Sequence, residues 1–169
     1  MPAIDKNIPS SGTNNRKLKI QVISFAYKSN SPPKANLLFD VRFIDNPFWV
    51  EDLRPLNGLD KKVQDFVLKQ DVSQQFLSAF KQMVKMIIPL QAASIVAKIG
   101  TPSEVETVFT IAFGCTGGWH RSVAVSGEAA RLINELFPEY EIEVVHKEIP
   151  SADTSPATTK QVAREETRP

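Results

Sequence analysis

The chain has 169 residues, 42% of them hydrophobic and 23% charged, which is typical of one globular domain of ordinary size. Its 20 basic and 19 acidic side chains leave a formal net charge of +1, so no overall field recruits nucleic acid or an anionic membrane. The single cysteine excludes an internal disulfide framework. With no signal-like or membrane-spanning apolar run, the sequence predicts a cytoplasmic protein.

Composition divides the chain into a folded centre and two polar ends. Residues 1–17 and 150–169 are rich in polar and turn-forming residues, and we expect both segments to be flexible. Residues 18–149 form the predicted domain. Within it, alternating and then continuous apolar residues predict strands over 18–28 and 36–44.

Two helices are predicted next, over 59–69 and from Asp71 onward. Asp60 and Asp71 are their candidate N-caps, Pro89 is expected to kink or end the second helix, and Gly100 to end the apolar segment beyond Pro89. Apolar residues recur at helical spacing in the second helix at Val72, Phe76, Ala79, Phe80, Met83 and Ile87.

The last predicted elements are a strand over 105–114, a helix over 120–137 and a strand over 141–149. Strands separated by helices are typical of an α/β domain, so we expect a single mainly parallel or mixed sheet flanked by helices.

The segment "IAFGCTGGWHRSV" at 111–123 runs from the carboxyl end of a predicted strand into the first turn of a helix. Free amide groups and the helix dipole favour an anion there. Glycine permits close approach of backbone to a ligand, and hydroxyls and a guanidinium can bind phosphate. The candidate ligand-binding residues are Thr116, Gly117, Gly118, His120, Arg121 and Ser122. The alternative is an ordinary turn with Arg121 in solvent.

Cys115 and Arg121 also have the C-x5-R spacing of cysteine-dependent phosphatases, in which a thiolate attacks phosphorus. Gly114 stands where the familiar signature has histidine, and the apolar strand before Cys115 suits a buried structural thiol. An enzyme with Cys115 and Arg121 as catalytic residues is therefore the alternative, and a binding protein is favoured.

A second polar group lies in "FDVRF", where Asp40 and Arg42 share one face of a predicted strand near its carboxyl end. These residues either bind the same ligand or form a structural ion pair, Asp40 with Arg42 or with Arg54. One cysteine and two distant histidines predict no metal site, and without a Walker or G-x-G-x-x-G motif we expect no cofactor.

Two long motifs, "NLLFDVRFIDNPFWVEDLRPLNGLDKKVQDFV" and "TIAFGCTGGWHRSV", together with "ISFAYK", closely resemble the C-terminal domain of the RapZ family of RNase adapter proteins. The resemblance covers about residues 18–149. It implies a sensor of glucosamine 6-phosphate, with Asp40, Arg42, Thr116, Gly117, Gly118, His120 and Arg121 at the matching motif positions. In the family, the full adapter also binds a small regulatory RNA and presents it to a ribonuclease.

Three departures limit what the resemblance implies. The P-loop domain of the family is not represented, so ATP binding is not carried over, although a separate nucleotide-binding protein remains a candidate partner. Phe48 stands where the RNA adapters have a histidine that helps to hold the sugar, so Phe48 and Arg54 are only possible ligand contacts. The segment 151–169 lacks the adapters' basic cluster, which weakens the case for RNA. A second copy of the chain is a further candidate partner.

Overall fold

Four parallel strands form the sheet, in the order β2-β3-β1-β4. The computed structural model describes residues 18–29, 31–97 and 107–150, so the predicted segment 1–17, Gly100 and all but the first residue of 150–169 lie outside the described residues. The strands are β1 (Leu18–Ala26), β2 (Leu37–Asp40), β3 (Thr107–Cys115) and β4 (Glu141–His146). The prediction of an α/β domain with a mainly parallel sheet is confirmed.

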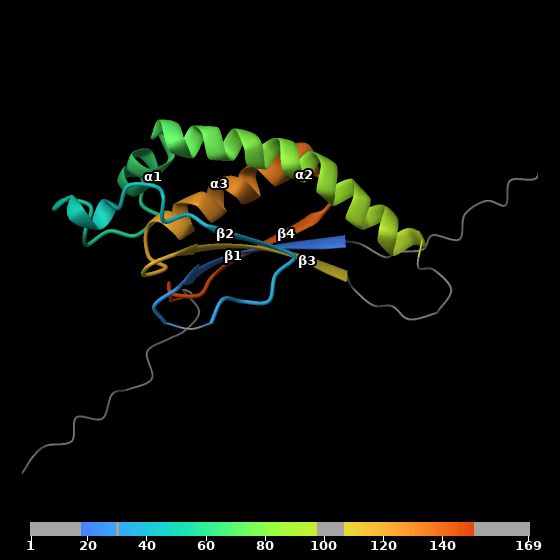
Figure 1. Ribbon diagram of the computed structural model, residues 1–169, viewed down its shortest axis with the longest axis horizontal. Coiled ribbons are helices and arrows are strands. Elements are labelled where there is room, and N and C mark those ends of the chain that lie inside the picture. Colours follow the sequence, from blue (N-terminus) through green and yellow to red (C-terminus); the bar gives the residue numbers. More distant parts are fainter. Residues whose placement is uncertain (1–17, 30, 98–106, 151–169) are drawn as a thin grey trace, which may run out of the picture.

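Three α-helices and one 3-10 helix complete the described chain: η1 (Pro47–Trp49), α1 (Lys61–Leu68), α2 (Asp71–Ala97) and α3 (Arg121–Leu136). All three α-helices lie on one face of the sheet, and the connection from β1 to β2 runs along the other face (Figure 1). No helix among the described residues is long and apolar enough to cross a membrane.

The main core lies between the sheet and the helices. α3 is the central helix, because it packs against β1, β3 and β4 as well as α1 and α2. Its buried residues include Val125, Ala129 and Ile133, all with no exposed surface. Beside it, rings from β2, β3 and α2 form an aromatic cluster of Phe39, Phe76, Phe80 and Phe113. Because α3 packs on the sheet and follows β3 after a short loop, its amino-terminal end lies at the carboxyl edge of the sheet.

The strand predicted over 36–44 ends at Asp40. The Val41 N–H still bonds to the Gly114 carbonyl, but the Asp40 carboxylate then accepts a hydrogen bond from the Arg42 N–H at 3.0 Å. Such a short side-chain to backbone bond favours a turn over a strand. Arg42 and Phe43 therefore lie on a turn instead of on alternate faces of β2.

Details of the predicted helices also differ. Asp60 is at the N-cap of α1 but makes no capping bond, because its carboxylate accepts from the Asn57 N–H, and Asp71 lies inside the first turn of α2. α2 continues through Pro89 to Ala97. Pro89 is exposed, as is Lys85 four residues earlier, so the carbonyl that loses its helical partner can bond to water.

Only one of the six apolar residues found at helical spacing in α2 is fully buried. The buried face consists of Ser73, Leu77, Phe80, Val84 and Ile88, whereas Val72 is 39% exposed. α2 has more apolar residues than its contact with the rest of the domain covers, and the remainder lie on a second face.

Candidate functional site

The loop between β3 and α3 depends on one glycine for its shape. Gly118 has a φ of +63°, and a Cβ there would lie 2.3 Å from Glu148 Cγ and 2.9 Å from the Ala26 nitrogen. Gly117 is exposed, and a Cβ there would meet no atom within 4 Å. Gly118 is therefore required by the fold, whereas Gly117 leaves space above the loop open.

Arg121, the first residue of α3, is buried, with 6% of its surface exposed. Its Nη1 donates to the carbonyls of Arg42 and Ile44 at 3.0 and 2.9 Å, and its Nη2 donates to Thr116 Oγ1 at 3.3 Å. Its Nε is buried without a hydrogen-bond partner. The guanidinium thus joins the turn after β2 to the loop after β3, and its Nε–H is left without an acceptor.

The charge of Arg121 is not neutralised by a salt bridge within the part of the chain that the structure describes. It also lies at the amino-terminal end of α3, where the helix dipole adds further positive potential and the first amide groups lack helical acceptors. The guanidinium charge and the helix dipole both add positive potential at this buried position, which is unfavourable unless an anion compensates it.

His120 precedes Arg121 and is also buried, with 7% of its surface exposed. Burial is the main reason that the pKa of His120 lies below its ordinary value of 6.5; hydrogen-bonding backbone groups of Arg54, Leu56 and Leu53 oppose that shift. Its Nε2 has no hydrogen-bond partner. At neutral pH the ring is therefore uncharged, and Nε2 donates or accepts a hydrogen bond according to the tautomer.

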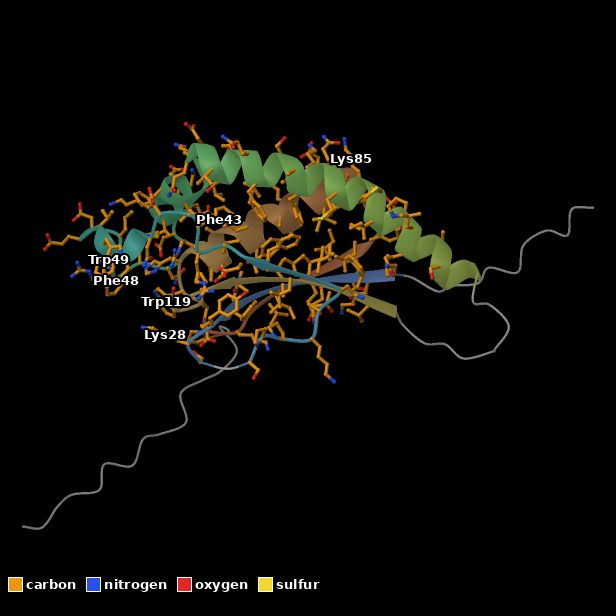
Figure 2. The ribbon with its side chains drawn as sticks, in the orientation of Figure 1. Lys28, Phe43, Phe48, Trp49, Lys85 and Trp119 are labelled. Carbon is orange, nitrogen blue, oxygen red and sulfur yellow. The ribbon has the colours of Figure 1, made fainter. Side chains whose placement is uncertain are left out.

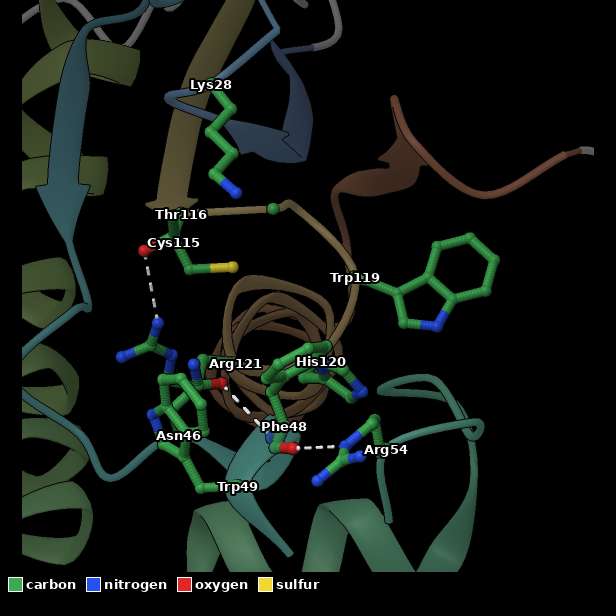
Figure 3. A pocket seen from close by; sticks show the side chains of 11 residues that line it. Lys28, Asn46, Phe48, Trp49, Arg54, Cys115, Thr116, Trp119, His120 and Arg121 are labelled. Carbon is green, nitrogen blue, oxygen red and sulfur yellow. Dashed lines mark hydrogen bonds between the residues drawn. The ribbon is translucent and has the colours of Figure 1, made fainter. Parts of the chain in front are cut away.

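A pocket of about 410 Å³ opens in front of these two residues. Figure 3 looks along α3 into this pocket, with Lys28 on one side, η1 on the other, and Trp119 at the edge. Among the described residues, the lining contains three cations, Lys28, Arg54 and Arg121, and no carboxylate. The full lining is Lys28, Asn46, Phe48, Trp49, Arg54, Cys115, Thr116, Gly117, Trp119, His120 and Arg121.

η1 forms the wall opposite the glycine loop. Asn46 caps it by accepting from the Phe48 N–H at 3.3 Å. Arg54 Nε donates to the Phe48 carbonyl at 3.0 Å, and the guanidinium lies 5.3 Å from the centre of the Phe48 ring. Trp49 is 76% exposed and packs edge-on against Phe48. This wall combines a cation with aromatic faces.

Asp40 and Arg42 lie near the pocket but do not line it. Arg42 Nη2 is 2.6 Å from Asp40 Oδ2, and the Arg42 guanidinium stacks 4.3 Å from the centre of the Tyr27 ring. The bond to Arg42 holds the pKa of Asp40 below its ordinary value. Of the partners that the sequence left open for Asp40, the structure has Arg42, and the Arg42 carbonyl in turn supports Arg121.

Cys115 is 3% exposed, and its Sγ lies 3.1 Å from Oγ of the fully buried Ser122. Arg121, the other residue of the C-x5-R spacing, uses both of its terminal nitrogens on protein oxygens. The arrangement therefore resembles a packed thiol more than an exposed nucleophile.

The structure brings together Thr116, Gly117, His120 and Arg121 with Phe48 and Arg54, and leaves Asp40, Arg42, Gly118 and Ser122 beside the pocket. Sequence reasoning missed four lining residues: Lys28, Asn46, Trp49 and Trp119. The motif "DNPFW", which directly follows the strand predicted over 36–44, was the available signal for Asn46 and Trp49. No group of three or more His, Cys, Asp or Glu residues within 18–29, 31–97 and 107–150 is arranged to hold a metal ion.

Comparisons with known proteins give a consistent result. Residues 18–150 match the family described as the RapZ C-terminal domain. A nucleotide-binding protein of Corynebacterium diphtheriae is 41% identical over 138 residues, which cover 82% of this chain and 42% of that protein. A nucleotide-binding protein of Caldanaerobacter subterraneus subsp. tengcongensis is 38% identical over 143 residues, 85% of this chain and 46% of that protein. The chain spans less than half the length of these relatives.

Proposed function

Because the chain belongs to the RapZ C-terminal domain family, a family of regulatory binding domains, we propose that it binds a phosphorylated small molecule in the pocket at the start of α3. The proposed ligand is an amino sugar phosphate such as glucosamine 6-phosphate. The observation that carries this proposal is the buried Arg121, whose charge has no salt bridge within the described residues and whose Nε has no acceptor.

The phosphate is assigned to the end of the pocket nearest α3. A dianion there neutralises Arg121, accepts from the free amide groups of the first helical turn and is within the field of Lys28 and Arg54, which line the same pocket. A lining with three cations and no carboxylate favours an anion over a neutral or basic ligand.

The sugar is assigned to the aromatic side of the pocket. Phe48, Trp49 and Trp119 offer apolar faces that can pack against the carbon-bound hydrogens of a sugar ring. His120 Nε2 is buried and unpartnered, and with the ring proton on Nδ1 it can accept from a hydroxyl or ammonium group. An amino sugar phosphate supplies all three features, namely a dianion, a ring and an additional donor.

A thermal shift assay tests this proposal, because a ligand that binds only the native state raises the unfolding temperature. We expect glucosamine 6-phosphate to raise it more than glucose 6-phosphate, inorganic phosphate or glucosamine. The variants Lys28→Gln and Arg54→Gln should reduce the shift, and Lys62→Gln on the exposed side of α1 is the matched control. Equal shifts with glucosamine and its phosphate would contradict an anion site.

Two other outcomes would favour the alternative functions. Hydrolysis of a phosphomonoester that is lost in Cys115→Ser would establish the phosphatase alternative. RNA binding whose affinity falls steeply with salt would support an RNA adapter. Relatives named nucleotide-binding proteins also lead us to propose that the domain works with a nucleotide-binding region or partner in the cytoplasm.

A further inference from the structure

Three aromatic rings surround the mouth of the pocket, and we call Phe48, Trp49 and Trp119 the aromatic rim. Trp49 is 76% exposed and Phe48 43% exposed, and their rings meet edge-on with planes at 82°. Figure 2 shows the rim and Lys28 at the same end of the molecule, away from Lys85 on α2. Because a single ring has only two faces, one sugar ring cannot cover all of this aromatic surface.

Backbone hydrogen bonds hold the segments that carry the aromatic rim. The Asn46 side chain caps η1, and Arg54 Nε donates to the Phe48 carbonyl at 3.0 Å. On the other side of the pocket, the Trp119 carbonyl accepts from the Gly58 N–H at 2.9 Å. The rim is therefore formed before any ligand arrives, which lowers the entropic cost of binding a ring there.

The polar groups beside the aromatic rim are mainly hydrogen-bond donors. Arg54 uses Nε on the Phe48 carbonyl, and its two terminal nitrogens bond to no other residue in the part of the chain that the structure describes. The Lys28 ammonium and the two indole N–H groups also line the pocket, and none of these three groups can accept a hydrogen bond. This surrounding favours a ring whose edge presents acceptors.

We propose that the aromatic rim is a subsite for a planar nitrogen heterocycle, and that the pocket also binds a nucleoside 5′-monophosphate with guanine as the preferred base. This proposal rests on the proposed function for one end of the ligand, because the nucleotide phosphate takes the place assigned above to the sugar phosphate, beside Arg121. The ribose then lies near His120, and the base stacks on the rim. Amino sugar phosphate and nucleotide therefore compete for one pocket.

The choice of guanine follows from the donors of Arg54. The two parallel N–H groups of a guanidinium match the O6 and N7 acceptors of guanine, whereas adenine has an amino group in place of O6. Arg54 also lies beside the Phe48 ring, 5.3 Å from its centre, so it can reach the edge of a base that stacks there. A purine stacked on the rim covers part of the exposed Trp49 ring, and such stacking contributes strongly to affinity.

Calorimetric titration with GMP, AMP and ribose 5-phosphate tests the subsite. GMP should bind about 10-fold or more tightly than ribose 5-phosphate, which has the phosphate and a sugar but no base, and about 5-fold or more tightly than AMP. Trp49→Ala should remove most of the advantage of GMP over ribose 5-phosphate, and Trp49→Phe should keep it. Arg54→Gln should bring GMP and AMP to similar affinities. Met86→Ala, which removes an exposed apolar side chain from α2, is the control and should bind as the wild type does.

Tryptophan fluorescence gives a second readout, because both tryptophans of the chain line this pocket. GMP should quench the emission, and Trp119→Phe, which leaves Trp49 as the single tryptophan, should keep the quenching. Circular dichroism confirms that each variant is folded. Quenching that is lost in Trp119→Phe although GMP still binds would contradict stacking on Trp49.

The outcomes separate this proposal from the proposed function. If ribose 5-phosphate and glucosamine 6-phosphate bind and GMP binds no more tightly than ribose 5-phosphate, the base subsite is overturned and the phosphate site stands. If none of the phosphorylated compounds binds, both proposals fail. Saturating glucosamine 6-phosphate should displace GMP, and binding of both at once would overturn the shared pocket.

Discussion

Two arginines on α3 are stabilised in opposite ways. Arg131 is exposed and pairs within its own helix, with Glu128 at 2.7 Å and Glu135 at 3.3 Å. Arg121 is buried, bonds to two backbone carbonyls and a hydroxyl, and has no salt bridge to a described carboxylate. Arg131 needs nothing outside the helix, whereas Arg121 supports two loops while its charge stays uncompensated. This difference supports the proposal that the pocket at the start of α3 binds an anion.

The largest effect should come from removing Arg121. Arg121→Met leaves the carbonyls of Arg42 and Ile44 without their donor, and each buried unsatisfied group costs about 1–3 kcal/mol. We expect a loss of about 3 kcal/mol in the free energy of unfolding, measured by urea denaturation. Arg131→Met is the matched control and should cost less than about 1 kcal/mol, because exposed ion pairs contribute little. Equal losses would refute the contrast between the two residues.

A somewhat smaller effect is expected at Gly118. Gly118→Ala places a side chain at a φ of +63° and against the Ala26 backbone, and a left-handed conformation alone costs roughly 1–2 kcal/mol. We expect a loss of about 2 kcal/mol, and less than about 0.5 kcal/mol for Gly117→Ala, which has open space around it. Chemical denaturation of both variants measures the difference, and a harmless Gly118→Ala would show that the loop can rearrange.

The pH dependence of stability tests the burial of His120. The pKa of His120 is lowered in the folded chain, so the unfolded chain binds more protons near pH 6 and stability falls as pH drops below about 6.5. His146 has a pKa lowered by burial and contributes in the same direction. His120→Gln should flatten this dependence by up to about 1.4 kcal/mol per unit of pKa difference. Denaturation from pH 5 to 8 gives the comparison, and an unchanged slope would place the titration at His146 alone.

Much of the fold was predictable from sequence because periodicity and turn residues act locally. The three long strands and α3 were placed to within a few residues. The alternation of strands and helices along the chain predicted a parallel sheet covered by helices. The failures had two causes. Asp40 ends β2 through a local bond to the Arg42 N–H, which the alternation of apolar residues does not reveal. The face of α2 that is buried depends on a tertiary contact, because it is set by where α3 lies.

The residues of the candidate site were likewise predictable only in part. The loop residues Thr116, Gly117, His120 and Arg121 were identified because strand, glycines and helix start are adjacent in sequence. Lys28 and Trp49 come from other segments, and only the packing of β1 and η1 beside the loop brings them to the pocket. The sequence also suggested that Arg121 is free to hold phosphate, whereas most of its donors are used by the protein.

The smallest effect on stability, and the clearest choice between the two views of the site, is expected for Asp40→Asn. The pair with Arg42 is half exposed, so its loss should change the free energy of unfolding very little. If the ligand is confined to the pocket, its affinity should change less than about 3-fold, corresponding to roughly 0.6 kcal/mol. If Asp40 and Arg42 bind the sugar, as the resemblance implies, the variant should weaken binding by about 10-fold or more, or roughly 1.4 kcal/mol. Calorimetric titration with glucosamine 6-phosphate separates these outcomes, with Arg54→Gln as the variant that should weaken binding in either case.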